Sequence, residues 1–209
     1  MTSESEPDCI VTSEGHAVKP AAHFARAISW IGHPLVFVTI SVGIVVGSRL
    51  ARRDGFSILL TLFVSVILPI ALLLFGGVRS GRWRDADISV RRERNRFYPI
   101  VIPLSAVGLA ALWFLRAPGF VLRGALVTLA LFLVAAMTNL WIKLSLHALF
   151  AFYCAIILFR INPLVGGVAF AVALLVFWSR LYLQRHDLPE MLIGVALGVC
   201  GGVVTAWWP

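Results

Sequence analysis

Long apolar stretches dominate this sequence, and short polar segments separate them. Most stretches contain about the 20 residues that a helix needs to cross the hydrocarbon core of a membrane. Their apolar and polar residues do not alternate, so the strands of a membrane barrel are not indicated. The pattern therefore predicts an all-α polytopic membrane helix bundle with six to seven transmembrane helices. The predicted helices cover residues 28–50, 56–78, 98–116, 120–142, 146–161, 163–183 and 190–208.

The chain before the first apolar stretch predicts a tail. Its start is polar and acidic and lacks the basic segment and short apolar run of a cleavable signal peptide. We expect residues 1–27 to be disordered or interfacial and residues 28–209 to form one transmembrane domain. The stretch 146–161 is shorter than a full span, so we expect it to be tilted, half-buried or continuous with the polar segment before it.

The composition supports a membrane protein and narrows the classes of partner. Hydrophobic residues make up 60% of the chain and charged residues 13%, which is too few charges to cover a soluble globule of this size. A net charge of +8 on so apolar a chain is typical of loops that face anionic lipid headgroups, so nucleic acid is not an expected partner. The wide spacing of Cys9, Cys154 and Cys200 does not suit a disulfide framework or a cysteine-based zinc site.

Three polar segments between the predicted helices carry most of the candidate chemistry. Residues 79–97 (79–99 with the motif considered below) hold seven Arg, two Asp and one Glu. Residues 143–147 hold a Lys, a Ser and a His, and residues 179–190 hold two Arg, a His, a Ser, a Tyr, a Gln, an Asp and a Glu. Two predicted helices separate the first segment from the second, and two more separate the second from the third. Because two spans return a chain to the same side, the three segments should meet on one face of the membrane.

The residue types in these segments suit a phosphate group. Ionisable residues at membrane depth are costly and point to function. Arg offers two parallel donors to phosphate oxygens, Lys adds a point charge and Ser a hydroxyl. A neutral imidazole can attack phosphorus while a second imidazole protonates the leaving oxygen. These roles require neither a metal nor an organic cofactor.

The third segment resembles the last motif of the type-2 phosphatidic acid phosphatase superfamily. That motif reads Ser-Arg, five residues, His, three residues, Asp. This chain has Ser179-Arg180, five residues, His186, three residues and Glu190. The substitution of Glu for Asp keeps the charge and lengthens the arm. Pro189 favours the first turn of a helix, so we expect His186 to lie just ahead of the last helix.

The other two motifs of the superfamily match in part. The middle motif, Pro-Ser-Gly-His, corresponds to residues 144–147, which keep Ser145 and His147. The first motif, Lys, six residues, Arg-Pro, aligns with Arg91, six residues and Tyr98-Pro99, so the basic start and the proline remain. Lys143 can restore the missing lysine. In a neighbouring register, the phosphate-holding residue is one of Arg92, Arg94 and Arg96.

The resemblance implies an integral membrane lipid phosphatase that works without metal through a phosphohistidine. It makes His186 the nucleophile, Glu190 the carboxylate that holds the ring tautomer, and His147 the general acid. The implied substrate is a phosphomonoester or diphosphate of a lipid, either a polyprenyl or a phosphatidyl lipid, in a bacterial cytoplasmic (inner) membrane. The residues assigned to phosphate binding are Arg180, Ser145, Lys143, Ser179 and either Arg91 or Arg92.

Two alternatives from other functional classes stay open. The losses in the first two motifs fit a non-catalytic protein that binds a lipid phosphate or a partner helix. Asp85 and Asp87 can bind Mg²⁺, and their loop loosely resembles an aspartate-rich motif of membrane prenyltransferases, although the sequence has no second acidic motif. The expected role of both Asp is capping or pairing with arginines. No role is assigned to His16, His23 and His33, which lie outside any motif.

The distribution of positive charge predicts the orientation. The side that carries the three polar segments has twelve Lys and Arg, and the opposite side has six. The positive-inside rule therefore favours a cytoplasmic position for the motif side. Arginines that hold a phosphate also enter this count, and removing five candidates leaves seven against six.

Overall fold

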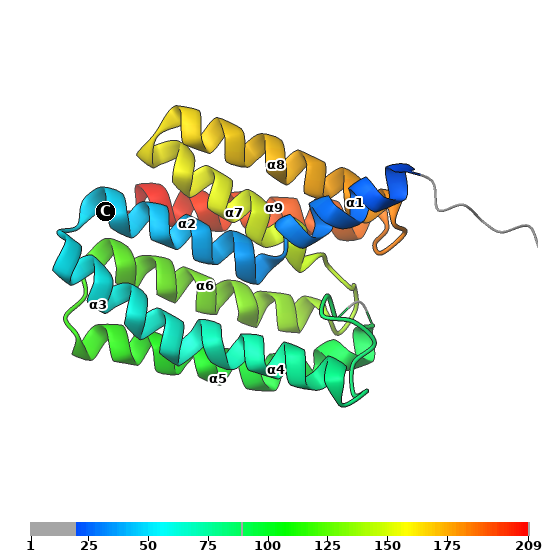
Figure 1. Cartoon of the computed structure of the whole chain (residues 1–209), viewed down its shortest axis with the longest axis horizontal. Helices are drawn as coiled ribbons and strands as arrows, with labels where there is room; N and C mark the ends of the chain where they lie inside the picture. Colours follow the sequence, from blue (N-terminus) through cyan, green and yellow to red (C-terminus); the bar gives the residue numbers. More distant parts are fainter. Residues whose placement is uncertain (1–19, 89, 209) are drawn as a thin grey trace, which may run out of the picture.

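The computed structural model describes residues 20–88 and 90–208, and within them the regular structure is helical. The helices from α2 onward run side by side along the long axis of the molecule (Figure 1). The predicted all-α membrane bundle is therefore confirmed. The elements are α1 (Pro20–Ile31), α2 (Pro34–Arg49), α3 (Arg52–Leu62), the π-helical turn η1 (Phe63–Ile67), α4 (Leu68–Arg79), α5 (Arg91–Phe114), α6 (Gly119–Thr138), α7 (Leu146–Ile161), α8 (Pro163–Tyr182) and α9 (Leu188–Trp207).

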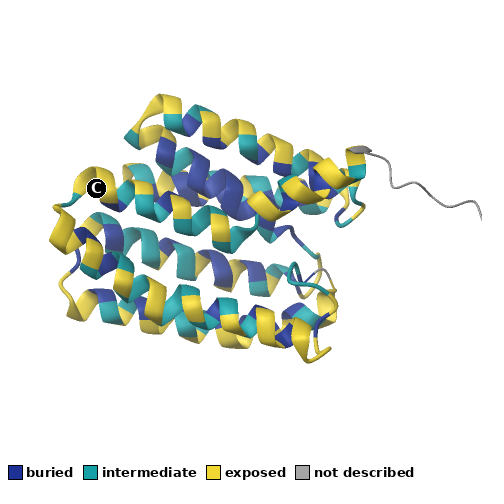
Figure 2. Ribbon diagram, in the orientation of Figure 1, coloured by how far each residue is buried: buried dark blue, intermediate teal, exposed yellow. Residues whose placement is uncertain are grey.

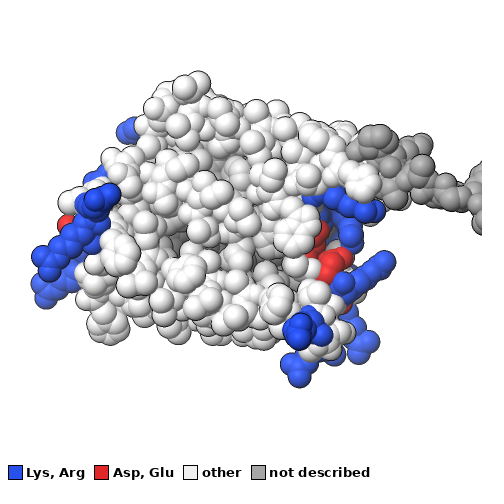
Figure 3. All heavy atoms as spheres, in the orientation of Figure 1, with Lys and Arg blue, Asp and Glu red and all other residues white. Residues whose placement is uncertain are grey.

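Length and composition make most of these helices candidate membrane spans. The continuous rod Arg52–Arg79 and helices α5, α6, α8 and α9 give five such spans, and α1 with α2, bent by 50°, gives a sixth. Lys and Arg gather at the two ends of the visible face and leave its middle uncharged (Figure 3). Exposed residues follow the outer faces of the helices (Figure 2). This arrangement suits a protein that crosses a membrane several times.

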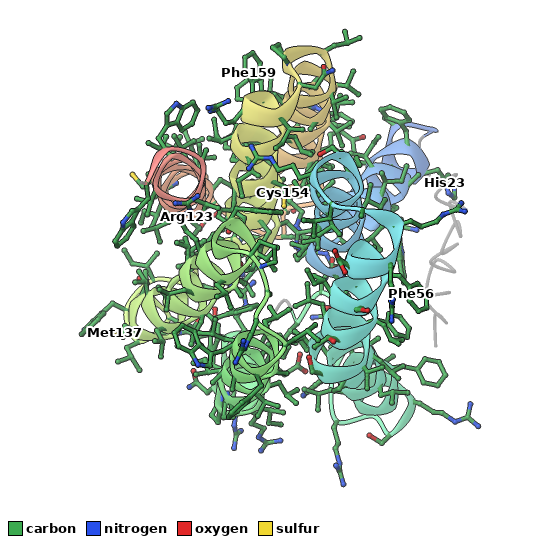
Figure 4. All side chains as sticks on the ribbon, turned by 90° about the vertical axis from the view of Figure 1, so that its left-hand side faces the viewer. His23, Phe56, Arg123, Met137, Cys154 and Phe159 are labelled. Carbon is green, nitrogen blue, oxygen red and sulfur yellow. The ribbon has the colours of Figure 1, made fainter. Side chains whose placement is uncertain are left out.

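The outward face of the bundle is apolar and its interior is packed. Seen from the end where α2 finishes, Phe56, Met137 and Phe159 lie on the periphery and Cys154 lies toward the interior (Figure 4). Phe56 is 66% exposed and Cys154 is 2% exposed. Large apolar side chains on the outside suit contact with lipid rather than water.

The chain departs from the sequence expectation near its start. Residues 1–19 of the predicted tail lie outside the described residues, but the chain is already helical from Pro20, so the expected disorder does not extend over residues 20–27. The first predicted span, 28–50, is broken at Gly32–His33. The break arises because Pro34 cannot donate a backbone hydrogen bond and instead begins α2.

Helix α7 is the short fifth stretch, and it occupies the middle of the bundle. It packs against α2, α8 and α9, and most of its first ten residues are buried. Its contact with α9 is close because a Cβ at Gly194 would lie 2.6 Å from the Ser145 carbonyl oxygen, and one at Gly198 would lie 2.2 Å from that of Leu149. Small residues permit such close helix packing. The start of α7 is thereby held beside the start of α9.

The three polar segments lie at one end of the molecule, as the number of intervening spans predicts. They follow α4, α6 and α8 and precede α5, α7 and α9, all at the right-hand end of Figure 1. A backbone hydrogen bond of 3.2 Å from Ser145 N to Glu190 O joins the second segment to the third. The bundle therefore brings together residues that lie far apart in the sequence.

Candidate active site

His186 and Glu190 form a hydrogen-bonded pair at the start of α9. His186 immediately precedes the N-cap residue Asp187, so its expected position just ahead of the last helix is confirmed. The His186 Nδ1 atom lies 2.6 Å from Glu190 Oε2. Glu190 also completes a capping box with Asp187, which fixes the carboxylate in the first turn. This contact puts the ring hydrogen on Nδ1 and leaves the lone pair of Nε2 available.

Arg94 joins all three polar segments. Its side chain is 1% exposed and its Nε donates to the Ile88 carbonyl oxygen at 2.9 Å. Its Nη1 donates to the Leu144 carbonyl oxygen, and its Nη2 lies 3.3 Å from His186 Nε2. The guanidinium therefore lies beside the nitrogen that the resemblance makes the nucleophile.

The structure does not bring Arg91 or Arg92 to this position. Arg91 donates to the carbonyl oxygens of Asn139 and Leu140, and the side chains of Arg91 and Arg92 are exposed. Arg94 shares one face of α5 with buried residues three, four and seven positions later. Arg92 points to another side of the helix, and Arg91 lies one turn before the buried stripe, at the first residue of α5. The neighbouring register considered from the sequence thus fits the structure.

Arg180 has one edge of its guanidinium without hydrogen-bond partners. The residue is completely buried, and its Nη1 donates to Ser29 Oγ at 2.7 Å and to Asp87 Oδ2 at 2.5 Å. Its Nε and Nη2 are buried and have no hydrogen-bond partner. Buried donors without partners are costly, and the Nε and Nη2 hydrogens point to the same side of the guanidinium. Together they can hold two oxygens of one anion.

His147 is the second residue of α7 and lies close to the first polar segment. It is 2% exposed, and its Nε2 lies 3.5 Å from Asp87 Oδ1. Its ring meets the His33 ring edge to face, with centroids 5.5 Å apart. His147 is therefore within the same cluster as Arg180, which also contacts Asp87.

The remaining candidates of the second segment have structural contacts as well. Ser145 is the N-cap of α7, and its Oγ accepts a hydrogen bond from Ala148 N at 3.4 Å. Its hydroxyl hydrogen can still be donated to a ligand. Lys143 Nζ donates to the Arg185 carbonyl oxygen at 3.0 Å and lies 3.9 Å from Glu190 Oε2. Lys143 thus adds positive charge beside the His186–Glu190 pair.

Ser179 is not brought to these side chains. Its hydroxyl donates to the Val176 carbonyl oxygen at 2.8 Å, one turn earlier in α8. Serine in a helix commonly returns its hydroxyl to the preceding turn. Its assignment to phosphate binding therefore has no support from the geometry, although the adjacent Arg180 turns into the cluster.

The electrostatics favour a neutral nucleophile and a bound anion. Burial, followed by the charges of Arg94 and Arg180, lowers the pKa of His186 to about 2. Burial alone would raise the pKa of Asp87, but hydrogen bonding and charge from His147 and Arg180 outweigh it and hold that pKa well below its usual range. The arginines and Lys143 carry three positive charges against two carboxylates. The cluster thus has an excess of positive charge.

Sequence reasoning missed two contributors to the cluster. Ser29 and His33 come from the α1–α2 region, which carries no motif, and no local signal marks them. Asp87 was considered as a magnesium ligand or an arginine partner, and the structure pairs it with Arg180. Asp85 pairs with Arg185 at 2.8 Å, so pairing with arginines, across segments rather than with neighbours, is what both carboxylates do. Within residues 20–88 and 90–208, no group of three or more His, Cys, Asp or Glu is placed to hold a metal ion.

Comparisons with protein-family models, curated proteins and solved structures found no match for this chain. The motif spacing and the geometry of the cluster are therefore the grounds for assigning a function.

Proposed function

We propose that this chain is an integral membrane lipid phosphatase that forms a phosphohistidine on His186. The observation that carries the proposal is the unused Nε–Nη2 edge of buried Arg180 in a cluster where His186 is held by Glu190 at 2.6 Å. An oxyanion on that edge would satisfy both orphaned donors. A neutral imidazole beside such an anion site supplies a nucleophile for phosphorus.

The proposed reaction has two displacement steps. The lone pair of His186 Nε2 attacks phosphorus, and the bond from phosphorus to the lipid oxygen breaks. His147 gives a proton to that oxygen, so the lipid leaves as an alcohol and the phosphoryl group stays on His186. A water molecule then attacks phosphorus while neutral His147 takes its proton. The phosphorus–nitrogen bond breaks, its electrons return to His186, and inorganic phosphate leaves.

The cationic groups have a common role in both steps. Arg94 lies 3.3 Å from His186 Nε2, so in the occupied site its Nη2 is placed to turn from the ring to a phosphoryl oxygen. Arg180 offers the paired donors described above, and Lys143 adds a further charge. Fixed donors of this kind stabilise the negative charge that spreads over the phosphoryl oxygens in the transition state. The mechanism needs no metal ion.

The position of the cluster supports an amphiphilic substrate. It lies where the apolar helices end, so a phosphate at headgroup depth can reach it while an attached hydrocarbon tail stays in the bilayer. We include in the proposal a polyprenyl or phosphatidyl lipid phosphate or diphosphate as substrate and a bacterial cytoplasmic membrane as location.

Phosphate release by the detergent-purified protein tests this proposal. Dodecyl phosphate, farnesyl diphosphate and phosphatidic acid are supplied separately, with EDTA or with Mg²⁺, to the wild-type protein and to His186→Asn. We expect release from at least one lipid in EDTA and none above background from the variant. Binding of these lipids without release would support the non-catalytic alternative. Strict dependence on Mg²⁺ would favour the prenyltransferase alternative through Asp85 and Asp87.

A further inference from the structure

The loop between α4 and α5 carries a second carboxylate into the centre of the cluster. Asp87 is joined to two different helices through its two oxygens. Oδ2 accepts from Arg180 Nη1 at 2.5 Å, and Oδ1 lies 3.5 Å from His147 Nε2. The side chain of Asp87 is 22% exposed, whereas those of its two partners are nearly inaccessible. One carboxylate thus contacts both the proposed general acid and the proposed phosphate-binding arginine.

The backbone on both sides of Asp87 is fixed. His33 Nδ1 accepts from Leu35 N at 3.3 Å, which caps α2 and leaves the ring hydrogen on Nε2. That Nε2 lies 3.4 Å from the Ala86 carbonyl oxygen, to which it can donate. On the other side, Ile88 has φ 47°, a left-handed conformation that is rare for a β-branched residue, and its carbonyl oxygen accepts from Arg94. The loop is therefore anchored at the residues before and after Asp87.

Asp87 orients Arg180 without covering its unused edge. The Asp87 and Ser29 oxygens both contact Nη1, while the Nε and Nη2 atoms remain without partners. A carboxylate that merely replaced an absent phosphate would be expected on that paired edge, where two parallel hydrogen bonds are available. The observed contact instead resembles the support that holds a ligand-binding side chain from behind.

The charge of Asp87 also bears on the chemistry of His147. A general acid must carry its proton when the leaving oxygen departs. Burial of this ring favours its neutral form, and the charged or titratable groups that face it are Asp87, Arg180, His33 and His186. Among these groups the Asp87 carboxylate is the one that favours the protonated imidazole, whereas burial, the arginine and the other two imidazoles oppose it.

We propose that Asp87 is a positioning residue that favours the protonated form of His147, which its role as general acid requires and which burial and Arg180 oppose, and that fixes Arg180 with its paired donors facing the phosphate. This inference rests on the proposed phosphatase function. It gives each histidine its own carboxylate: Glu190 holds the nucleophile in its neutral tautomer, and Asp87 favours the charged form of the acid.

Substrates that differ in their need for a proton test the role of Asp87. Dodecyl phosphate releases an alkoxide-like oxygen that must be protonated, whereas 4-nitrophenyl phosphate releases a phenolate that is stable without a proton. Asp87→Asn should lower kcat on dodecyl phosphate by about 10²- to 10³-fold and kcat on 4-nitrophenyl phosphate by less than about tenfold. The alkaline limb of the dodecyl phosphate profile should move to a pH about 1 unit lower, because the imidazolium loses its stabilising charge.

Asp85→Asn is the matched control. It removes an equal charge from the same loop, two residues away, where the carboxylate pairs with Arg185. We expect it to change kcat on either substrate by less than about twofold. Equal losses on both substrates in Asp87→Asn, with an unmoved alkaline limb, would show a merely structural role and overturn the inference. If Asp87→Asn does not fold, Asp87→Glu replaces it, and an unchanged ratio of the two kcat values would overturn the inference.

Ligand binding separates failure of this inference from failure of the proposed function. If the wild-type protein releases no phosphate from either substrate, the phosphatase proposal fails. Orthovanadate, a phosphate analogue, then still probes the arginine arrangement through its effect on thermal stability. Vanadate should raise the melting temperature of the wild-type protein and of Asp85→Asn but have at most half that effect on Asp87→Asn. An equal effect on all three proteins would show that Asp87 does not position the anion site.

Discussion

The Nη2 atom of Arg94 lies 3.3 Å from the Nε2 atom of His186, although the two residues belong to the first and third polar segments. Arg94 reaches this place because it continues the buried stripe of α5 by one turn toward the end of the bundle. His186 reaches it because the first turn of α9 holds Glu190 against its other nitrogen. The contact therefore depends on helical phase at one partner and on helix capping at the other.

The first prediction concerns which arginine of α5 acts on phosphate. Arg94→Lys keeps the charge but loses the guanidinium fork, so we expect kcat/KM on a lipid phosphate to fall by about 100-fold or more. Arg91→Lys, one turn earlier on the same helix, should stay within about threefold of the wild-type value. Melting temperatures of both variants show whether folding is preserved. Losses of equal size would mean that Arg94 has no special part in the reaction.

The second prediction concerns the Glu190 carboxylate. Glu190→Gln keeps the shape of the side chain but can donate to His186 Nδ1 as well as accept from it, so the nucleophile can adopt the wrong tautomer. We expect kcat to fall by about 10²- to 10⁴-fold, the range seen when such an orienting carboxylate becomes an amide. Asp187→Asn is the control because Asn also caps a helix well, and its kcat should change little. A Glu190→Gln variant with wild-type kcat would remove Glu190 from the mechanism.

The third prediction is a dependence of stability on pH. An unfolded His takes up a proton below its ordinary pKa of 6.5, whereas His186 in the folded protein does so only near pH 2. Between these values the unfolded state binds more protons, so stability falls as the pH is lowered. At pH 5, His186 should lower the free energy of unfolding by about 2 kcal/mol relative to its value above pH 6.5.

Thermal unfolding in detergent at pH 7 and pH 5 measures this effect. The melting temperature of the wild-type protein should fall more than that of His186→Asn over this range. Asp87 does not confuse the comparison, because a carboxylate with a lowered pKa loses its stabilising effect only below its ordinary value of 3.8. Equal falls in the two proteins would contradict the buried neutral state of His186.

The fold was largely predictable because membrane helices follow from local composition. The lengths of the apolar stretches predict where the spans lie, and counting the stretches predicts the number of spans to within one. The same count predicts that the three polar segments lie on a common side. The break at Gly32–His33 was not predicted, since a proline inside a membrane helix can also be accommodated as a kink. At the break, a Cβ on Gly32 would lie 2.0 Å from Val176 of α8, a close tertiary contact that the sequence pattern does not reveal.

The site was predictable only where its parts are local. His186 and Glu190 lie four residues apart, so their spacing in the sequence already indicates a pair. Ser29 is 151 residues from Arg180, and its contact depends on how α1 packs against α8. Arg94 could have been chosen over Arg92 from its phase with the apolar stripe of α5. The contacts of Asp87 could not have been predicted, because the direction of its side chain depends on an irregular loop with an unusual backbone conformation at Ile88.

The last prediction concerns the orientation in the membrane. Arg94 and Arg180 are buried in the cluster, so their charges serve the site rather than the topology. Removing these two from the twelve positive residues on the motif side leaves ten against six, which still favours the cytoplasm for that side. We therefore predict that the proposed site faces the cytoplasm.

Single cysteines in a cysteine-free background test this orientation. Ser80 is exposed at the end of α4 near the site, and Gly119, where a Cβ would meet nothing within 4 Å, begins α6 at the opposite end. In intact bacterial cells, a membrane-impermeant thiol reagent should label Gly119→Cys and leave Ser80→Cys unmodified until the cells are permeabilised. The reverse labelling would place the cluster on the outer face. In that case the positive-inside rule would not hold for this chain. Phosphate binding would then have to explain the excess of arginine on the motif side.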